Sequence, residues 1–240
     1  MTLGFYNHVN TKPQATIASL ESIRKFYPTA PIALSCDNAY DFTDIAKQYN
    51  AFYEHNDVTL GYPVQPFGYR KSQILEWSDR MYRGVSRLYT DYFVMMEDDV
   101  HVVSAIEIDP TWEMAGHMYS PGQVYLIPDE LLDMISTFSG IRPKTNYYNC
   151  GGGSIFKTST FLNNYSRVRD FFDVNLDYIQ DNIYPTAGWM DCYMCLFYYL
   201  CGKDLVQNIR LYNNWPIKIQ FEMRDVPVGT YLIHNFKDYY

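Results

Sequence analysis

The chain has 240 residues, of which 48% are hydrophobic and 19% are charged, a composition typical of a globular protein. Its formal net charge of −8 argues against non-specific binding to nucleic acid or to anionic membranes, so we expect no nucleic-acid partner. No basic segment precedes an apolar core at the N-terminus, and no run of about 18 apolar residues occurs, so we expect neither a signal peptide nor a transmembrane segment. Five cysteines, an odd number, are typical of free thiols in a reducing compartment, and we expect a cytoplasmic protein.

Strand and helix patterns alternate through residues 1–100. Short apolar runs and helical spacing of apolar side chains predict, in chain order, strand Leu3–Asn7, helix Pro13–Phe26, strand Pro31–Cys36, helix Asp41–Tyr49, strand Ala51–His55, helix Tyr69–Leu88 and strand 92–96. Glycines and prolines between 59 and 68 predict a loop before the long helix. The alternation predicts an α/β fold with a mostly parallel sheet and right-handed crossovers.

The second half of the chain is less regular. Its patterns predict a strand at Gln123–Ile127, a glycine-rich turn entering a strand at Cys150–Phe156, helices Thr158–Phe172 and Met190–Leu200, and a last strand or extended tail at Tyr231–His234. No linker-like composition separates the two halves, so we predict a single domain over residues 1–240.

An acidic triplet follows the most apolar strand. The run at 92–96 is the pattern of a strand buried on both faces, and it leads directly into Glu97, Asp98 and Asp99. Neighbouring carboxylates repel each other unless a cation lies among them, and open α/β sheets bind ligands at the carboxyl ends of their strands. The sequence therefore predicts a site for a hard divalent cation and an enzyme acting on a phosphate-containing substrate. An acidic turn without a metal is the simpler alternative.

The order of these features resembles the glycosyltransferases of the GT-A fold, and more narrowly the small glycosyltransferases encoded by large algal viruses. The triplet at 97–99 matches the DxD-type motif of that family, and the segment Tyr231–Lys237 resembles its C-terminal segment. The resemblance implies a Rossmann-type sandwich with a central, mostly parallel mixed sheet flanked by helices. It also implies that residues 1–100 bind a nucleotide sugar, that residues 101–240 bind the acceptor, and that a viral protein would act in the host cytoplasm.

The resemblance assigns the metal and diphosphate contacts, with Mn²⁺ or Mg²⁺ as the cofactor. Asp99 is implied as a direct ligand and catalytic residue, and Glu97 as a contact of the metal, of a bound water or of the ribose. Asp98 is implied to face the sugar hydroxyls. His234 would complete the metal shell and Lys237 would contact the diphosphate, whereas a structural histidine is the alternative. The chain ends shortly after Lys237, so we expect that it could be part of a longer protein.

Donor-binding residues are implied at the ends of the earlier strands. Asn7 and His8 end the first strand, where the family holds the base and ribose, and Asp37 could accept a hydrogen bond from uracil or ribose. Asp37 could instead be a turn residue. Two cations at the start of the long helix, beside free backbone amides, would attract a diphosphate, or they could form a solvated basic turn. The cations are Arg70 and Lys71, and Tyr69 precedes them at the start of the helix.

The acceptor side rests on a glycine run and a helix start. Gly151, Gly152 and Gly153 resemble the small-residue turn that frames the sugar pocket in the family, although a simple tight turn is the alternative. Asp191 is the candidate general base of an inverting enzyme, and Trp189 is a candidate stacking surface for a sugar ring. Helix capping is the alternative for Asp191, and retaining enzymes need no such base.

The implied function is metal-dependent transfer of a hexosyl or deoxyhexosyl group from a UDP-sugar to a hydroxyl of a glycan or glycoprotein acceptor. A metal-dependent phosphohydrolase or nucleotidyltransferase is an alternative, but it should show a second acidic cluster, such as Asp170 with Asp173 or Asp177 with Asp181. A non-catalytic carbohydrate-binding module is a further alternative, and it would not need the acidic triplet.

Overall fold

The computed structural model describes residues 1–117, 126–148, 152–208, 210–211 and 228–234, to which the structural statements below refer. Its centre is a seven-stranded sheet of order β3-β2-β1-β4-β7-β6-β8, in which only β7 runs antiparallel to its neighbours. The strands are β1 (Leu3–Val9), β2 (Ile32–Cys36), β3 (Phe52–Tyr53), β4 (Tyr92–Glu97), β6 (Met114–Gly116), β7 (Ser154–Lys157) and β8 (Leu205–Gln207). The predicted α/β fold with a mostly parallel mixed sheet is confirmed.

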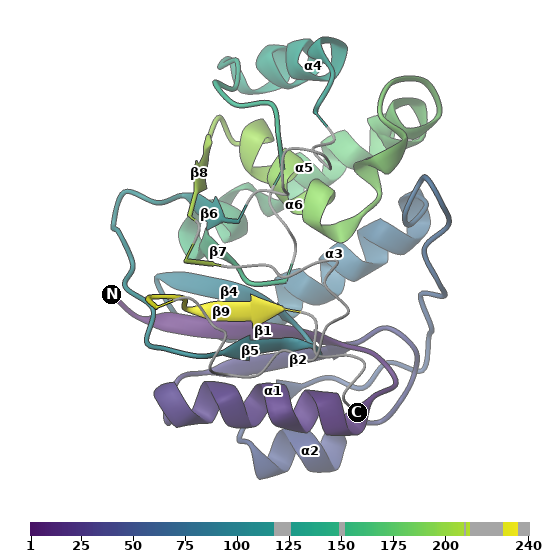
Figure 1. Cartoon of the computed structure of the whole chain (residues 1–240). Coiled ribbons are helices and arrows are strands. Elements are labelled where there is room, and N and C mark those ends of the chain that lie inside the picture. Colours follow the sequence, from purple (N-terminus) through teal and green to yellow (C-terminus); the bar gives the residue numbers. More distant parts are fainter. Residues whose placement is uncertain (118–125, 149–151, 209, 212–227, 235–240) are drawn as a thin grey trace.

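Helices cover both faces of this sheet (Figure 1). One face carries α1 (Pro13–Phe26), α2 (Thr43–Gln48) and a two-stranded ribbon of β5 (Val100–Val102) and β9 (Leu232–His234). The other face carries α3 (Lys71–Val85), α5 (Thr158–Tyr178) and α6 (Met190–Leu200), with α4 (Asp129–Ser139) packed against α6. Each face has its own hydrophobic core, so the sheet is the shared middle layer.

Strand β4 is buried on both faces, as its unbroken apolar run predicts. Phe93 and Met95 pack into the core beneath α3, α5 and α6, whereas Val94 and Met96 pack into the core beneath α1. Period-two alternation sends successive side chains to opposite faces. A strand flanked by two cores can hold polar groups only at its end, and Glu97 occupies that end.

Helix α1 buries Leu20 and Ile23 of its apolar stripe, together with residues that the apolar spacing does not include. Its buried residues are Ala15, Thr16, Ser19, Leu20 and Ile23, whereas Ile17 is half-buried. Two hydroxyl residues therefore lie on the buried side, where Ser19 meets the backbone of β5. Helix α3 follows the prediction closely, since Ile74, Trp77, Met81 and Val85 are all buried.

Several short elements were not predicted. Strands β5, β6 and β8 have three residues each, too few to display a period, and helix α4 was also missed. Helix α5 continues to Tyr178 and then into a π-helical turn at Ile179–Ile183. The predicted strand at Gln123–Ile127 lies largely outside the described residues, and its described end at 126–127 is not in a strand.

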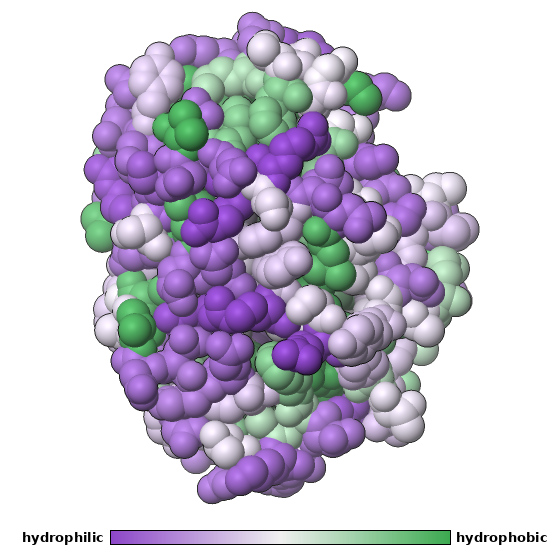
Figure 2. All heavy atoms as spheres, turned by 180° about the vertical axis from the view of Figure 1, so that it is seen from behind, coloured by the Kyte–Doolittle hydropathy of each residue, from purple (hydrophilic) through white to green (hydrophobic). Residues whose placement is uncertain are grey.

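The surface opposite to the view of Figure 1 is largely hydrophilic, with separate hydrophobic patches (Figure 2). Within the described parts of the chain, the helices fall short of the length and hydrophobicity that crossing a membrane requires.

Candidate metal and donor site

The polar residues singled out in the sequence end neighbouring parallel strands. The register pairs His8 of β1 with Glu97 of β4, and Val9 of β1 with Cys36 of β2, which Asp37 follows. The carboxyl ends of β1, β2 and β4 therefore form one edge of the sheet. This edge brings together the predicted residues His8, Asp37 and Glu97.

Glu97, Asp99 and His234 form one cluster at this edge. The Nε2 atom of His234 lies 3.1 Å from Oδ1 of Asp99 and 3.5 Å from Oε2 of Glu97. One ligand atom from each of the three residues falls within 4.8 Å of the others. Asp99 is 0% and His234 8% exposed, whereas the side chain of Glu97 is 28% exposed, so the cluster is buried on one side and open at Glu97. Two carboxylates and an imidazole at this spacing could hold a divalent cation.

The ribbon of β5 and β9 explains how residue 234 reaches residue 99. Val100 pairs with His234 and Val102 with Leu232 in an antiparallel register. The histidine therefore stands beside the turn that carries Asp98 and Asp99. Asp98 is also buried, at 2% exposure.

Helix α1 holds strand β5 of this ribbon. The hydroxyl of Ser19 donates to the carbonyl of Val100 at 2.8 Å, and the amide of Val102 donates to the hydroxyl of Ser22 at 3.0 Å. The Asn7 amide in turn donates to Ser19 Oγ at 3.1 Å. Buried backbone groups need partners, and serine side chains supply them here. The sequence reasoning missed this role of Ser19 and Ser22, although two serines three residues apart beside apolar positions are a usable signal.

Of the three predicted glycines, Gly152 packs against the cluster and Gly153 packs against the ribbon of β5 and β9. A Cβ at Gly152 would lie 2.6 Å from Val100 Cγ2 and 3.3 Å from Glu97 Oε1. Gly153 adopts a φ of +98° and donates its amide to the Met95 carbonyl at 2.7 Å. Glycine at 152 therefore lets the chain approach the Glu97 carboxylate closely. Gly151 lies outside the described residues, as does Lys237.

The electrostatics of the cluster favour a positive charge. Burial by itself lowers the pKa of His234, but its contacts with Asp99 and Glu97 more than offset that effect and raise the pKa to about 10. Without a metal, the imidazolium therefore supplies the cation that the two carboxylates require.

A second group surrounds Asp37, which is 3% exposed. Its Oδ2 lies 2.7 Å from Nε2 of His8 and accepts a hydrogen bond from the Tyr69 hydroxyl at 3.0 Å. Its Oδ1 is buried without a hydrogen-bond partner among the described residues. One carboxylate oxygen is thus fixed, and the other is a buried acceptor that the described residues leave without a hydrogen bond.

The proton position on His8 follows from its neighbours. Burial lowers the pKa of His8, and Asp37 more than offsets that effect, so the pKa is raised. However, the indole N–H of Trp77 donates to His8 Nδ1 at 3.1 Å, which requires that nitrogen to be unprotonated. In a neutral ring, Nε2 therefore carries the proton and donates a hydrogen bond to Asp37.

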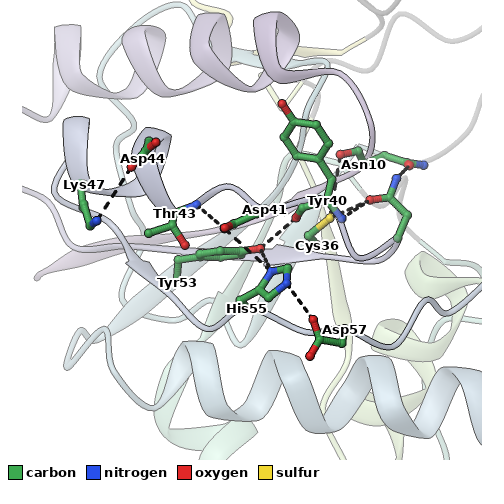
Figure 3. Close-up of polar contacts among 11 residues, drawn as sticks. Asn10, Cys36, Tyr40, Asp41, Thr43, Asp44, Lys47, Tyr53, His55 and Asp57 are labelled. Atoms are coloured by element: carbon green, nitrogen blue, oxygen red, sulfur yellow. Dashed lines mark hydrogen bonds and ion pairs between the residues drawn. The ribbon is translucent and has the colours of Figure 1, made fainter.

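Amide side chains line the rim beside Asp37, and Figure 3 shows part of this rim around Asn10, Cys36 and Tyr40. The Asn38 side chain donates to Oδ1 of Asn10 and accepts from the Cys36 thiol and from the backbone amide of Tyr40. Farther along the chain, His55 Nε2 lies 3.0 Å from Asp57 (Figure 3). The turn after Asp37 thus carries neutral hydrogen-bonding groups.

The two predicted cations of α3 form ion pairs away from the cluster. Arg70 pairs with Asp181 at 2.9 Å, and Lys71 pairs with Asp177 at 2.7 Å. Both acids lie at the C-terminal end of α5 and in the π-helical turn that follows it. The diphosphate contact of Arg70 and Lys71 stays a prediction, and Tyr69 contacts Asp37.

The start of α6 is joined to the loop before α3. The Trp189 indole donates to the Pro66 carbonyl at 3.0 Å, and the amide of Tyr69 donates to the Gly188 carbonyl at 2.9 Å. The fully buried Gln180 donates to the carbonyls of Phe67 and Tyr69. Asp191 lies in the first turn of α6, where its Oδ1 accepts from the Cys192 amide at 2.8 Å. The sequence reasoning missed Gln180, for which it offered no signal.

Comparison with solved structures identifies the fold. Mouse xyloside xylosyltransferase 1 matches with a TM-score of 0.51 at 10% identity, over 99% of both chains. The galactosyltransferase LgtC matches with a TM-score of 0.52 at 13% identity, over 97% of this chain and 87% of its own. The glycosyltransferase GlyE of Streptococcus pneumoniae matches with a TM-score of 0.51 at 12% identity, over 96% of this chain but 54% of its own.

These structural neighbours are glycosyltransferases of the GT-A fold, and the chain has that fold over nearly its full length. No protein-family profile matches the sequence, and no curated protein sequence matches it either. The narrower resemblance to enzymes of algal viruses stays a prediction, because likenesses at 10–13% identity show the fold alone.

Replacement of Gly152 by alanine should damage the cluster, because the added methyl would press on Val100 and Glu97. We expect the free energy of unfolding to fall by about 1–3 kcal/mol, as for other overpacked sites, and divalent-cation binding to weaken. Urea unfolding and Mn²⁺ titration measure the two effects. Gly140→Ala is the control, since Gly140 has a φ of +77° but no atom lies within 4 Å of the place that its Cβ would take. It should lose stability without losing metal binding.

The metal-free protein should lose stability as the pH rises from 6.5 to about 10. His234 has a folded-state pKa of about 10 against an ordinary value of 6.5. Its contribution is therefore fully present below pH 6.5 and gone above pH 10. Urea unfolding in EDTA at several pH values, for wild type and His234→Gln, isolates this contribution by difference. A difference that stays constant across this range would contradict the prediction.

Proposed function

We propose that the protein is a metal-dependent glycosyltransferase that moves a sugar from a UDP-sugar to a hydroxyl group of a glycan acceptor. The observation that carries this proposal is the cluster of half-buried Glu97 with buried Asp99 and His234 at the carboxyl edge of a GT-A sheet. The structure of LgtC contains donor and acceptor sugar analogues, which supports a two-substrate transfer reaction for a chain of the same fold.

Glu97, Asp99 and His234 are the residues that would hold Mn²⁺ or Mg²⁺. Their mixed oxygen and nitrogen set favours Mn²⁺, because Mg²⁺ prefers oxygen ligands alone. A cation bound there would stabilise the negative charge that develops on the diphosphate leaving group. We assign Asp98 to the sugar hydroxyls, and Lys237, with Arg70 and Lys71, to the diphosphate.

Asp37 supplies the base recognition. Its free Oδ1 can accept but not donate a hydrogen bond, while His8 and Tyr69 fix the other oxygen. Uracil presents an N–H at position 3, whereas cytosine presents an acceptor there. A carboxylate held in this way therefore favours UDP over CDP. Asn7 lies on the neighbouring strand β1 and supports the turn that carries Asp99, through Ser19.

The acceptor would lie beside α6. The half-buried Trp189 offers a ring whose N–H is already satisfied by Pro66, so its apolar face is suited to a sugar ring. Asp191 would accept the proton of the attacking hydroxyl if the enzyme inverts stereochemistry. Gly152 and Gly153 would frame the transferred sugar.

The alternatives fit the site less well. A two-metal phosphohydrolase needs a second acidic cluster, yet Asp177 and Asp181 are paired with Lys71 and Arg70. Over the part of the chain that the structure describes, only Glu97, Asp99 and His234 meet the geometry of a metal site. A carbohydrate-binding module would not require such a cluster.

Replacement of Asp99 by asparagine should abolish metal-dependent binding of UDP and transfer from a UDP-sugar. The change keeps the shape but removes a charged ligand, so we expect Mn²⁺ affinity to fall by at least ~100-fold, since even partners that only orient ligands account for about 10–100-fold. Calorimetric titration with UDP, with and without Mn²⁺, measures this loss. Asp129→Asn, an exposed partner of Arg142, is the matched control and should behave as wild type. Unchanged turnover in Asp99→Asn would refute the metal assignment.

Replacement of Asp37 by asparagine should reduce the preference for UDP over CDP. Asparagine offers an N–H as well as an oxygen, so it can pair with either base edge, and we expect the ratio of the two affinities to fall about tenfold, the effect of about 1.4 kcal/mol. Parallel titrations of UDP and CDP in Mn²⁺ measure the ratio. Equal losses for both nucleotides would place Asp37 at the ribose instead, and unchanged affinities would remove it from the donor site.

A further inference from the structure

A cluster of three side chains holds the chain just before β9, at the opposite end of this strand from His234. The guanidinium of Arg210 lies 3.9 Å from the centre of the Tyr231 ring, and it pairs with Glu107 Oε2 at 3.0 Å. The Tyr231 hydroxyl donates to the same carboxylate oxygen at 3.1 Å. Arg210 Nε also donates to the carbonyl of Gly229 at 2.7 Å. We call Glu107, Arg210 and Tyr231 the β9 clamp.

We propose that the β9 clamp is a positioning device that fixes His234 and thereby sets the affinity of the site for a divalent cation. The proposal rests on the metal site of the proposed function. It gives a role at that site to three residues that do not contact the cluster.

Backbone hydrogen bonds join the clamp to the ribbon. The amide of Tyr231 donates to the Arg210 carbonyl at 2.7 Å, and the carbonyl of Tyr231 accepts from the amide of Val103 at 2.9 Å. The Ser104 hydroxyl donates to the carbonyl of Thr230 at 2.6 Å. Tyr231 is 1% exposed, so its ring is a buried anchor. The chain therefore enters β9 held on both sides.

The register of β9 transmits this anchoring to the metal site. Strand β9 has only three residues, so His234 lies about 10 Å from Tyr231 at the ~3.3 Å rise of a strand. Leu232 and His234 share one face of the strand, and Leu232 packs against Gly153 beside the cluster. A slip of one residue would turn Ile233 toward Asp99 and His234 away from it. Three residues of pairing are a weak determinant of register, and the clamp adds a fixed point at their start.

The ion pair of the clamp is poorly placed to stabilise the fold as a whole. The side chains of Arg210 and Glu107 are 42% and 81% exposed, and exposed ion pairs add little to global stability. Metal sites, by contrast, require ligands held within about 0.5 Å of the productive geometry. The two effects can therefore be measured separately.

The test is a titration of the full chain with Mn²⁺ alone, in which the relaxation rate of water protons reports the bound fraction of Mn²⁺. We expect Arg210→Gln to weaken Mn²⁺ binding about tenfold, the lower end of the range for residues that orient metal ligands. Arg142→Gln removes an exposed arginine that pairs with Asp129 and Asp133, and it should leave the affinity unchanged. Wild-type affinity in Arg210→Gln would overturn the proposal.

A double-mutant cycle separates positioning from a general structural effect. If Arg210 acts through His234, Arg210→Gln should have no further effect on Mn²⁺ affinity in a His234→Ala background. The same fold-loss in both backgrounds would overturn the proposal. If circular dichroism shows that Arg210→Gln does not fold, Tyr231→Phe replaces it, since that change removes only the hydroxyl bond to Glu107. Tyr231→Phe should reduce Mn²⁺ affinity by less than Arg210→Gln does, and this reduction should also disappear in the His234→Ala background.

Failure of the metal site and failure of the clamp give different results. The proposed metal site fails if wild type does not bind Mn²⁺, or if it binds Mn²⁺ as tightly after Asp99→Asn as before. In either case the role of the clamp fails with it. If wild type and Asp99→Asn behave as expected but Arg210→Gln matches wild type, only the clamp is refuted.

Discussion

Repulsion between two neighbouring carboxylates, one of them fully buried, is the constraint on which the rest of this site depends. Glu97 and Asp99 lie at the end of a strand covered on both faces, where Asp99 is fully buried and Glu97 is half-buried, so water screens them less than it screens surface acids. A positive group must lie between them, and His234 provides it from a distant part of the chain. The raised pKa of His234 has the same cause, because Asp99 and Glu97 stabilise a positive charge at this position. That charge can be carried by the imidazolium or by a metal ion.

The neighbouring structure serves to hold these charges in place. Gly152 leaves room for the Glu97 carboxylate, Ser19 satisfies the carbonyl of Val100, which follows Asp99, and β9 delivers the histidine. Each support comes from a different element, so the ligands stand on a rigid frame rather than on a single loop. Such frames suit a site whose charge interactions are strong and depend steeply on distance.

Charge neutralisation and nucleotide recognition are assigned to separate groups in the proposed reaction. The cluster at β4 and β9 handles the cation, whereas Asp37 at the end of β2 presents one free oxygen beside neutral amides. Tyr69 connects this second group to the acceptor side, because its hydroxyl holds Asp37 while its backbone is bonded to Gly188 and Gln180. The loop before α3 thus belongs to both halves of the proposed reaction.

Features that depend on local order could be predicted from the amino-acid sequence. The alternation of strands and helices, the two-sided burial of β4 and the acids at its end all follow from patterns a few residues long. Which distant groups meet does not follow from local patterns: the pairing of His234 with Asp99 was implied only by the family resemblance, and the other contacts were visible only in the folded chain. His234 and Asp99 are 135 residues apart, Ser19 and Val100 are 81 apart, and Arg70 and Lys71 are paired with acids of the α5 end. Three-residue strands such as β5 and β9 carry no period of their own, so their register is set by the packing around them and not by their sequence.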